Sequence, residues 1–331
     1  MLNKLISMQE AVSRFTWDGM TYAHGSAYPV GADTIAFGRE MVKQGRKNLN
    51  MISHCGSQQV NLLAAAGRVR RVEVGFSGLE VYGFANGLNR MVTSGKTVIE
   101  DYSNGAMSWR YFGGAMNWPF VPATVCIGSD QEWCSGDYPD EYPCKRKIPR
   151  IRDPFTGREY GAFSVLRPDV AAIHVTLADI RGNGIMLGSE WNRFEMSRAA
   201  QKVILVADHI VDTGCMRQYP NLVRIIGELV DGVVYWPMSA WPAGSPGVHD
   251  SDEQHMFYMN DCFNSDQGTS DYISHYVTGY RSRQEFMKMI GDENIRKLTN
   301  TSTAFLIDPY RKWIISDEEI EALERKAGEG R

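Results

Sequence analysis

The segment Glu100-Asp101-Tyr102-Ser103 offers two carboxylates, a phenol and a hydroxyl without a break. It follows the short apolar run 97–99, whose β-branched residues predict the end of a buried strand. Acidic side chains at the carboxyl end of a strand are well placed to act as acids, bases or substrate-binding groups. The alternative is that Asp101 or Ser103 caps a helix by accepting hydrogen bonds from backbone N–H groups. Asn104-Gly105, directly after them, predicts a turn.

Three more segments rich in small or polar residues also follow predicted strands. They are His24-Gly25-Ser26, Cys55-Gly56-Ser57 and Gly75-Phe76-Ser77-Gly78. In an open α/β sheet, the carboxyl ends of parallel strands form the ligand crevice, so these loops are expected to converge with the Glu100 segment. The competing explanation is that turns between strands and helices favour glycine and serine for their geometry.

The framework that must position these segments is an alternation of strands and helices. This spacing predicts an open, mostly parallel, doubly wound α/β sheet flanked by helices. Strands are expected at 20–23, 49–53, 71–74, 97–99, 170–175, 202–207 and 230–236, and helices at 7–15, 33–44, 60–66, 79–94, 196–201, 283–290 and 317–326. We expect residues 1–331 to form a single domain with two loop-rich excursions, a cover loop at 130–157 and a second at 237–280.

Composition excludes several classes of protein. The 331 residues carry a formal net charge of −4, which gives no electrostatic reason to expect nucleic acid or an anionic membrane. No apolar run approaches the roughly 20 residues that cross a bilayer. Six cysteines without a Cys-x-x-Cys pair disfavour disulfides and structural zinc, so we expect a reduced, cytoplasmic protein with no metal site. The histidines His249 and His255 fit no standard zinc spacing, and a solvated loop is the simpler interpretation.

The order of these elements and several motifs resemble the α-type subunit of family I CoA-transferases, the glutaconate CoA-transferase group in particular. The similarity covers about residues 7–315 and is carried by Glu100-Asp101-Tyr102-Ser103, Trp118-Pro119-Phe120-Val121-Pro122-Ala123-Thr124, Asp153-Pro154-Phe155, Pro168-Asp169-Val170-Ala171-Ala172-Ile173-His174 and Ala199-Ala200-Gln201-Lys202-Val203-Ile204. Such proteins usually carry Gly-Gly-Phe after the first strand, where this chain has His24-Gly25-Ser26.

The resemblance implies a heterodimer or α2β2 heterotetramer with a β-type subunit, together with chemistry on acyl-CoA thioesters without a permanently bound cofactor. In the family the β-type subunit carries the nucleophilic glutamate. A related branch resembles steroid-degradation hydrolases that open a ring of a CoA thioester, and there the implicated α-subunit glutamate corresponds to Glu100.

Three functions therefore remain open. A transferase would use backbone N–H groups near Gly25 or Gly75 for the oxyanion, with His24, Phe76, Asp101 and Tyr102 around the substrate and serines at its carboxylate, among them Ser26, Ser77 and Ser103. A hydrolase would use Glu100 as a general base. A structural or ligand-sensing subunit on the same fold would need neither.

Overall fold

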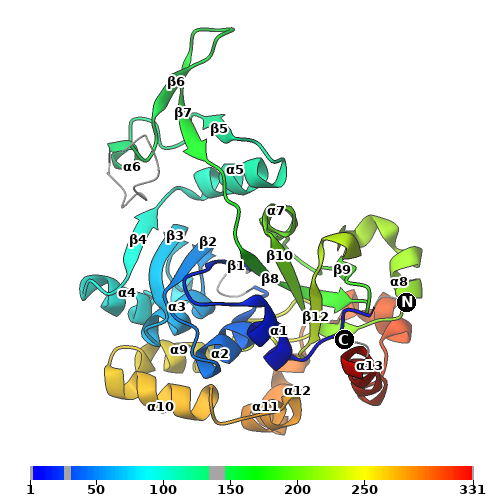
Figure 1. The fold of residues 1–331 in the computed structure, drawn as a ribbon. Helices are drawn as coiled ribbons and strands as arrows, with labels where there is room; N and C mark the ends of the chain where they lie inside the picture. Colours follow the sequence, from blue (N-terminus) through cyan, green and yellow to red (C-terminus); the bar gives the residue numbers. More distant parts are fainter. Residues whose placement is uncertain (1–2, 26–30, 134–145, 330–331) are drawn as a thin grey trace.

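A computed structural model describes residues 3–25, 31–133 and 146–329 of the chain, and its centre is a nine-stranded sheet (Figure 1). Seven strands run parallel in the order β12-β10-β8-β1-β2-β3-β4. Two short strands, β9 and β11, extend the sheet antiparallel beside β8. The strands are β1 (Thr21–Gly25), β2 (Leu49–Gly56), β3 (Val69–Ser77), β4 (Val98–Asp101), β8 (Val170–Ala178), β9 (Gly184–Ile185), β10 (Lys202–Ile210), β11 (Val223–Ile225) and β12 (Gly232–Tyr235). The predicted mostly parallel α/β class is confirmed.

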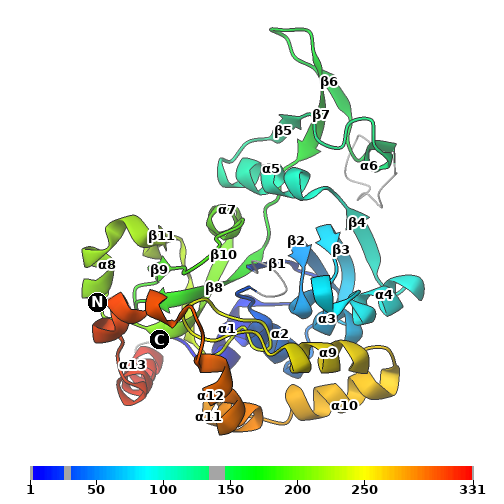
Figure 2. The same ribbon diagram turned by 180° about the vertical axis from the view of Figure 1, so that it is seen from behind.

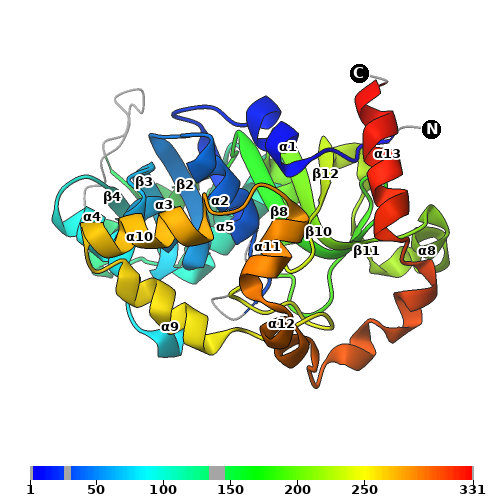
Figure 3. The same cartoon turned by 90° about the horizontal axis from the view of Figure 1, so that it is seen from below.

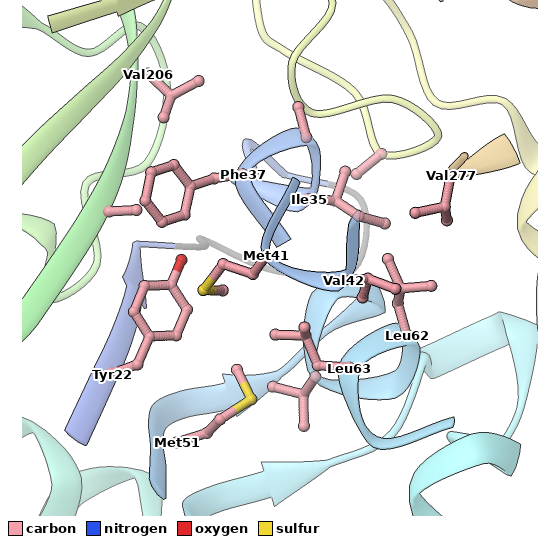
Figure 4. Packing of buried hydrophobic residues seen from close by; sticks show 14 of the residues in the cluster. Tyr22, Ile35, Phe37, Met41, Val42, Met51, Leu62, Leu63, Val206 and Val277 are labelled. Carbon is pink, nitrogen blue, oxygen red and sulfur yellow. The ribbon is translucent and has the colours of Figure 1, made fainter. Parts of the chain in front are cut away.

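One face of the sheet packs against helices that follow its first strands and against helices near the end of the chain. Figure 3 shows α9, α10 and α11 running across this side. The helices are α1 (Met8–Phe15), α2 (Ile35–Lys43), α3 (Gln58–Ala65), α4 (Asn86–Thr93), α9 (Glu253–Cys262), α10 (Asp266–Tyr276), α11 (Arg283–Ile290) and α12 (Asp292–Thr299). Side chains from α2, α3, β1 and β2 interlock there, among them Phe37, Leu63, Tyr22 and Met51 (Figure 4). Alternate strand residues point into this core because the side-chain period of a strand is two.

The helix α1 shows how local sequence sets an element. Ser7 is its N-cap and accepts a hydrogen bond from the backbone N–H of Glu10 at 3.1 Å. Met8, Ala11, Val12 and Phe15, spaced at helical intervals, are the buried residues. The strand β8 is buried along its whole length, as a near-continuous apolar run in the middle of a parallel sheet should be.

The opposite face of the sheet is covered by α5 (Asn104–Ala115) and α7 (Arg193–Ala199). Beyond α5, a three-stranded antiparallel sheet of order β5-β7-β6 stands away from the main sheet (Figures 1 and 2). Its strands are β5 (Phe120–Ala123), β6 (Arg150–Arg152) and β7 (Glu159–Ser164), with α6 (Asp130–Trp133) between β5 and β6; the remaining helices are α8 (Thr213–Gln218) and α13 (Asp317–Glu329). None of the helices in the described ranges is long and apolar enough to cross a membrane.

Several local predictions are wrong, each for a physical reason. Asn104-Gly105 does not form a turn but opens α5, because Ser103 caps the helix and apolar residues follow. The helix expected at 79–94 is split into a 3-10 turn at 80–82 and α4, with Gly83 between them at φ +92°.

The two expected loop-rich excursions contain more regular structure than predicted. The segment 130–157 contributes α6 and β6, and residues 134–145 of the expected cover loop lie outside the described part of the chain. The segment 237–280 contains α9 and α10, whose caps Asp252 and Ser265 bind the N–H groups of His255 and Gly268. Aromatic residues on these helices pack onto the core, so tertiary contacts select helix where the polar sequence has no clear period.

Candidate active site

Glu100 lies in the edge strand β4, with its side chain turned inward. The β3–β4 register places it opposite Glu73, and only 3% of Glu100 is exposed. Its carboxylate lies 3.9 Å from the Arg71 guanidinium and 3.6 Å from the Lys147 ammonium group. The apolar neighbours Val98 and Ile99 are 37% and 38% exposed, the reverse of the expected pattern. An inward-pointing charge is a common feature of edge strands.

Glu73 completes a largely buried network of charges around Glu100. Its carboxylate lies 2.7 Å from the guanidinium of Arg110 and 3.4 Å from that of Arg71. Burial by itself would raise the pKa of Glu73, but Arg110 and Arg71 outweigh it and hold the pKa below its usual value. Two carboxylates are therefore held by three cations, since Lys147 joins through Glu100.

Tyr102 packs against two cations of this network. It is buried, with the Arg110 guanidinium 4.0 Å and the Lys147 ammonium group 4.3 Å from its ring centre. Asp101, by contrast, points outward and reaches Lys147 at 3.5 Å and Gln131 at 3.2 Å. The first three residues of the Glu100-Asp101-Tyr102-Ser103 segment thus face different surroundings.

Ser103 is the N-cap of α5. Its hydroxyl accepts a hydrogen bond from the N–H of Ala106 at 3.1 Å and lies 3.3 Å from the Cys126 sulfur. The capping alternative weighed for Ser103 is therefore the one that the structure contains. The side chain is half-buried, at the amino end of α5 beside the carboxyl edge of the sheet.

The segment His24-Gly25-Ser26, expected as a loop after the first strand, begins inside β1. His24 and Gly25 belong to the strand itself, and His24 is buried with its Nδ1 3.8 Å from the Asp33 carboxylate. Burial lowers the pKa of His24, which favours the neutral imidazole at pH 7. A Cβ on Gly25 would lie 2.9 Å from the Cα of Ile173, so close approach of β8 requires glycine there. Ser26 lies outside the described residues.

The segment after β3 is likewise mostly strand. A Cβ on Gly75 would meet the Asn104 side chain at 2.3 Å, because the amino end of α5 packs onto this glycine. Phe76 is exposed, and Ser77 ends the strand opposite Gly56. Since Glu100 is level with Glu73, four residues before Ser77, its backbone is about 13 Å from that strand end. The structure therefore does not bring Glu100 and Ser77 together.

A hydrogen-bonded chain at the carboxyl end of β2 was missed by the sequence reasoning. The Cys55 sulfur lies 3.4 Å from Nδ1 of His54, and Nε2 of His54 lies 3.1 Å from the Ser108 hydroxyl. Ser108 in turn donates to Asn192 at 3.1 Å, and the Trp191 ring meets His54 edge-on at 4.8 Å. The adjacent His54-Cys55 pair was visible in the sequence, but its partners come from α5 and the start of α7.

The Cys55–His54 pair is neutral at pH 7. Burial raises the pKa of the Cys55 thiol to about 11, and burial lowers the pKa of His54. Cys55 is therefore a protonated thiol in the resting protein.

A second buried polar cluster lies on the other face of the sheet. His174 in β8 reaches the Asp208 carboxylate at 2.9 Å, and Ser245 donates to Asp208 at 2.6 Å. Burial opposes ionisation, but His174, His249 and Ser245 outweigh it and lower the pKa of Asp208 to about 2. His174 is thus a buried core residue with a hydrogen-bond partner. In the described ranges, no group of three or more His, Cys, Asp or Glu side chains is arranged to hold a metal ion.

Comparisons with known proteins agree with this architecture. The family described as Coenzyme A transferase matches residues 5–234. An uncharacterized protein of Archaeoglobus fulgidus is 34% identical over 294 residues, 88% of this chain but only 63% of the relative's own length. The A subunit of the 3-oxoadipate CoA-transferase of Pseudomonas knackmussii is 26% identical, over 87% of this chain and 99% of that protein.

Two further matches are a ring-cleaving hydrolase subunit and a CoA-transferase of known structure. The cholesterol ring-cleaving hydrolase IpdA subunit of Mycobacterium tuberculosis is 23% identical over 74% of this chain and 84% of its own length. The crystal structure of glutaconate coenzyme A-transferase from Acidaminococcus fermentans superposes with a TM-score of 0.86 at 21% identity, covering 96% of this chain and 99% of that one. The resemblance seen in the sequence is confirmed, and the chain belongs to the coenzyme A transferase family.

Proposed function

We propose that the chain is the α-type subunit of a heteromeric CoA-transferase that moves CoA between carboxylic acids. The nucleophilic glutamate comes from a β-type partner, in a heterodimer or an α2β2 heterotetramer. The observation that supports this most directly is the pairing of Glu73 and Glu100 with cations, because a carboxylate engaged in buried ion pairs is poorly placed to attack a thioester. The family match and the 3-oxoadipate CoA-transferase relative support the same assignment.

The reaction proceeds in two exchanges at the partner's glutamate. Its carboxylate attacks the acyl-CoA carbonyl, which forms an acyl-glutamyl anhydride and releases the CoA thiolate. The thiolate then attacks the glutamyl carbonyl, giving a glutamyl-CoA thioester and the free carboxylic acid. The acceptor acid reverses these steps and leaves as the new acyl-CoA, so CoA is a substrate and no permanently bound cofactor is needed.

This chain contributes the substrate-binding wall at the carboxyl edge of the sheet. We assign the oxyanion donors to backbone N–H groups near Gly25-Ser26 and after Gly75-Phe76, and the carboxylate contacts to Ser77 and Ser103. His24 lies buried in β1 below this wall and contributes a neutral polar group, since burial lowers its pKa. Asp101 and Tyr102 contribute indirectly, because both contact Lys147 and position its side chain.

The test is reconstitution. The purified chain, the partner and their complex are each assayed for transfer of CoA from an acyl-CoA to an acceptor carboxylate. We expect activity from the complex and none from either chain alone. Turnover by this chain unaided would refute the assignment.

A second candidate is the ring-opening hydrolase subunit with Glu100 as general base, which the similarity to the IpdA protein favours. The burial of Glu100 between Arg71 and Lys147 weighs against it, because a general base must reach the proton that it removes. Loss of the thioester from the complex without any acceptor acid would favour the hydrolase, whereas loss that requires the acceptor would favour the transferase.

A further inference from the structure

The three-stranded sheet β5-β7-β6 has two different faces. Its inner face, which carries Val121 and Phe163, packs into the core beside α5. Because strand residues alternate between the faces of a sheet, its outer face takes the intervening positions. These positions are Phe120, Pro122, Ile151, Tyr160 and Ala162. All five are exposed or half-buried, and Phe120 is 41% exposed.

The outer face is apolar, although it is partly open to solvent. An antiparallel sheet with one solvated face normally places polar residues there. Here the five positions hold two aromatic rings, a proline, an isoleucine and an alanine. An exposed apolar surface of this kind commonly marks a contact with another protein.

The same sheet continues into an arm, residues 150–160, that stands away from the rest of the molecule (Figures 1 and 2). Phe155 lies at its tip and is 95% exposed. The turn is nevertheless ordered, because the Phe155 N–H donates to the Asp153 carboxylate at 2.9 Å and the Asp153 N–H donates to the Arg158 carbonyl at 2.8 Å. Since the backbone that presents the ring is already fixed, little conformational entropy is lost when the ring binds another surface.

The arm extends past the carboxyl edge of the main sheet. At its start β5 follows Pro119, which lies beside Thr21 and Arg71 near the starts of β1 and β3. Lys147, three residues before β6, instead contacts Asp101 at the end of β4. The hairpin therefore continues outward from the level of the carboxyl edge, and the five residues from its base to its tip span up to about 17 Å.

Charge indicates what kind of surface the arm fits. Residues 146–160 contain five cations and two carboxylates, namely Arg146, Lys147, Arg150, Arg152 and Arg158 against Asp153 and Glu159. A second copy of this chain, docked through the same surface about a two-fold axis, would bring these like charges together, which opposes binding. A partner of different sequence can instead place carboxylates around an apolar pocket.

We propose that the arm and the outer face bind the β-type partner, with Phe155 inserted into an apolar pocket of that subunit that acidic residues surround. This rests on the proposed function, in which the partner brings a glutamate to the carboxyl edge that the arm overhangs. The arm then holds the partner in position through contacts that lie outside the acyl site itself.

The test measures the dissociation constant between the purified chain and the purified β-type partner by surface plasmon resonance, together with CoA transfer by their complex. The variants are Phe155→Ser and Arg152→Glu, both exposed on the arm. The matched controls are Phe305→Ser, which is 66% exposed in the 3-10 turn Ala304–Leu306, and Arg311→Glu, at an exposed arginine paired with Asp308. All four proteins should unfold in urea at the wild-type midpoint, because each side chain is largely exposed.

We expect Phe155→Ser to weaken partner binding at least about tenfold, mainly through faster dissociation, since buried aromatic anchors carry much of the binding energy of an interface. Arg152→Glu should slow association and reduce its dependence on salt. Both controls should bind like the wild type. In the purified complex, a photo-crosslinker introduced as Phe155→p-benzoylphenylalanine should form its crosslink to the β-type partner.

The proposal is overturned if both arm variants bind the partner like the wild type, if the controls weaken binding equally, or if the crosslinks join two copies of this chain. An arm-dependent complex that transfers no CoA would refute only the proposed reaction. A fully active complex that forms equally well with the arm variants would refute only the role of the arm.

Discussion

Replacing Glu100 with glutamine should lower the free energy of unfolding by about 2 kcal/mol and leave CoA transfer nearly unchanged. The carboxylate is buried and lies 3.9 Å from Arg71 and 3.6 Å from Lys147. Removing one partner of a buried ion pair typically costs about 3–5 kcal/mol. Both distances are long, and each cation keeps a second carboxylate, Glu73 for Arg71 and Asp101 for Lys147. The expected cost therefore lies below that range.

The assay combines urea unfolding of the variant chain with steady-state kinetics of the complex that it forms. Glu159→Gln is the matched control, because Glu159 is a half-exposed carboxylate 3.3 Å from Arg150 and should cost less than about 1 kcal/mol. A stability loss with kcat/KM within a few-fold of the wild type supports a structural Glu100. A drop of about 10²–10⁴ in kcat with an intact fold would refute this reasoning and establish Glu100 as an acid–base group.

Three other changes test separate parts of the account. Ser103→Ala should lower the free energy of unfolding in urea by about 1 kcal/mol, because the N–H of Ala106 loses its cap. Ser103→Thr should keep most of that free energy, since threonine can also cap. Equal stability of the wild type and both variants would contradict the capping role. Cys55 should react with iodoacetamide at pH 8 far more slowly than free glutathione, because burial raises the pKa of its thiol to about 11. Peptide mass spectrometry measures the labelling rate, and rapid labelling would show an activated thiol instead. Asp208 has a pKa lowered to about 2, so its contribution is fully present above its unfolded value of about 3.9 and is lost as pH falls through about 2. Asp208→Asn should therefore destabilise the chain by about 2–3 kcal/mol at pH 7 and by much less at pH 2, and a cost independent of pH would count against the lowered pKa of Asp208.

The sheet could be predicted because the apolar composition of each strand identifies it without knowledge of its neighbours. Runs such as Val170–Ala178 are mostly apolar, and a parallel sheet buries such strands on both faces. The helices α9 and α10 were missed because their sequence is polar and aromatic without a clear period. Buried contacts such as those between Tyr272 and Phe263 stabilise them, and a local pattern does not contain such contacts.

The site was harder to predict, and Glu100 shows the reason. The sequence places it after an apolar run, which indicates a strand tip, but the strand continues to Asp101 and turns Val98 and Ile99 outward. The cations that draw Glu100 inward, Arg71 and Lys147, lie 29 and 47 residues away in the chain. Pairings of this kind depend on register and on tertiary packing, so residue types and spacing alone do not reveal them.

We expect the covalent intermediate to form on the partner and not on this chain. The most direct test incubates the complex with acyl-CoA without acceptor, separates the two proteins and measures the intact mass of each. We predict a CoA adduct on a glutamate of the partner and an unmodified mass for this chain. An adduct on this chain, at Glu100 or at any other residue, would contradict the account.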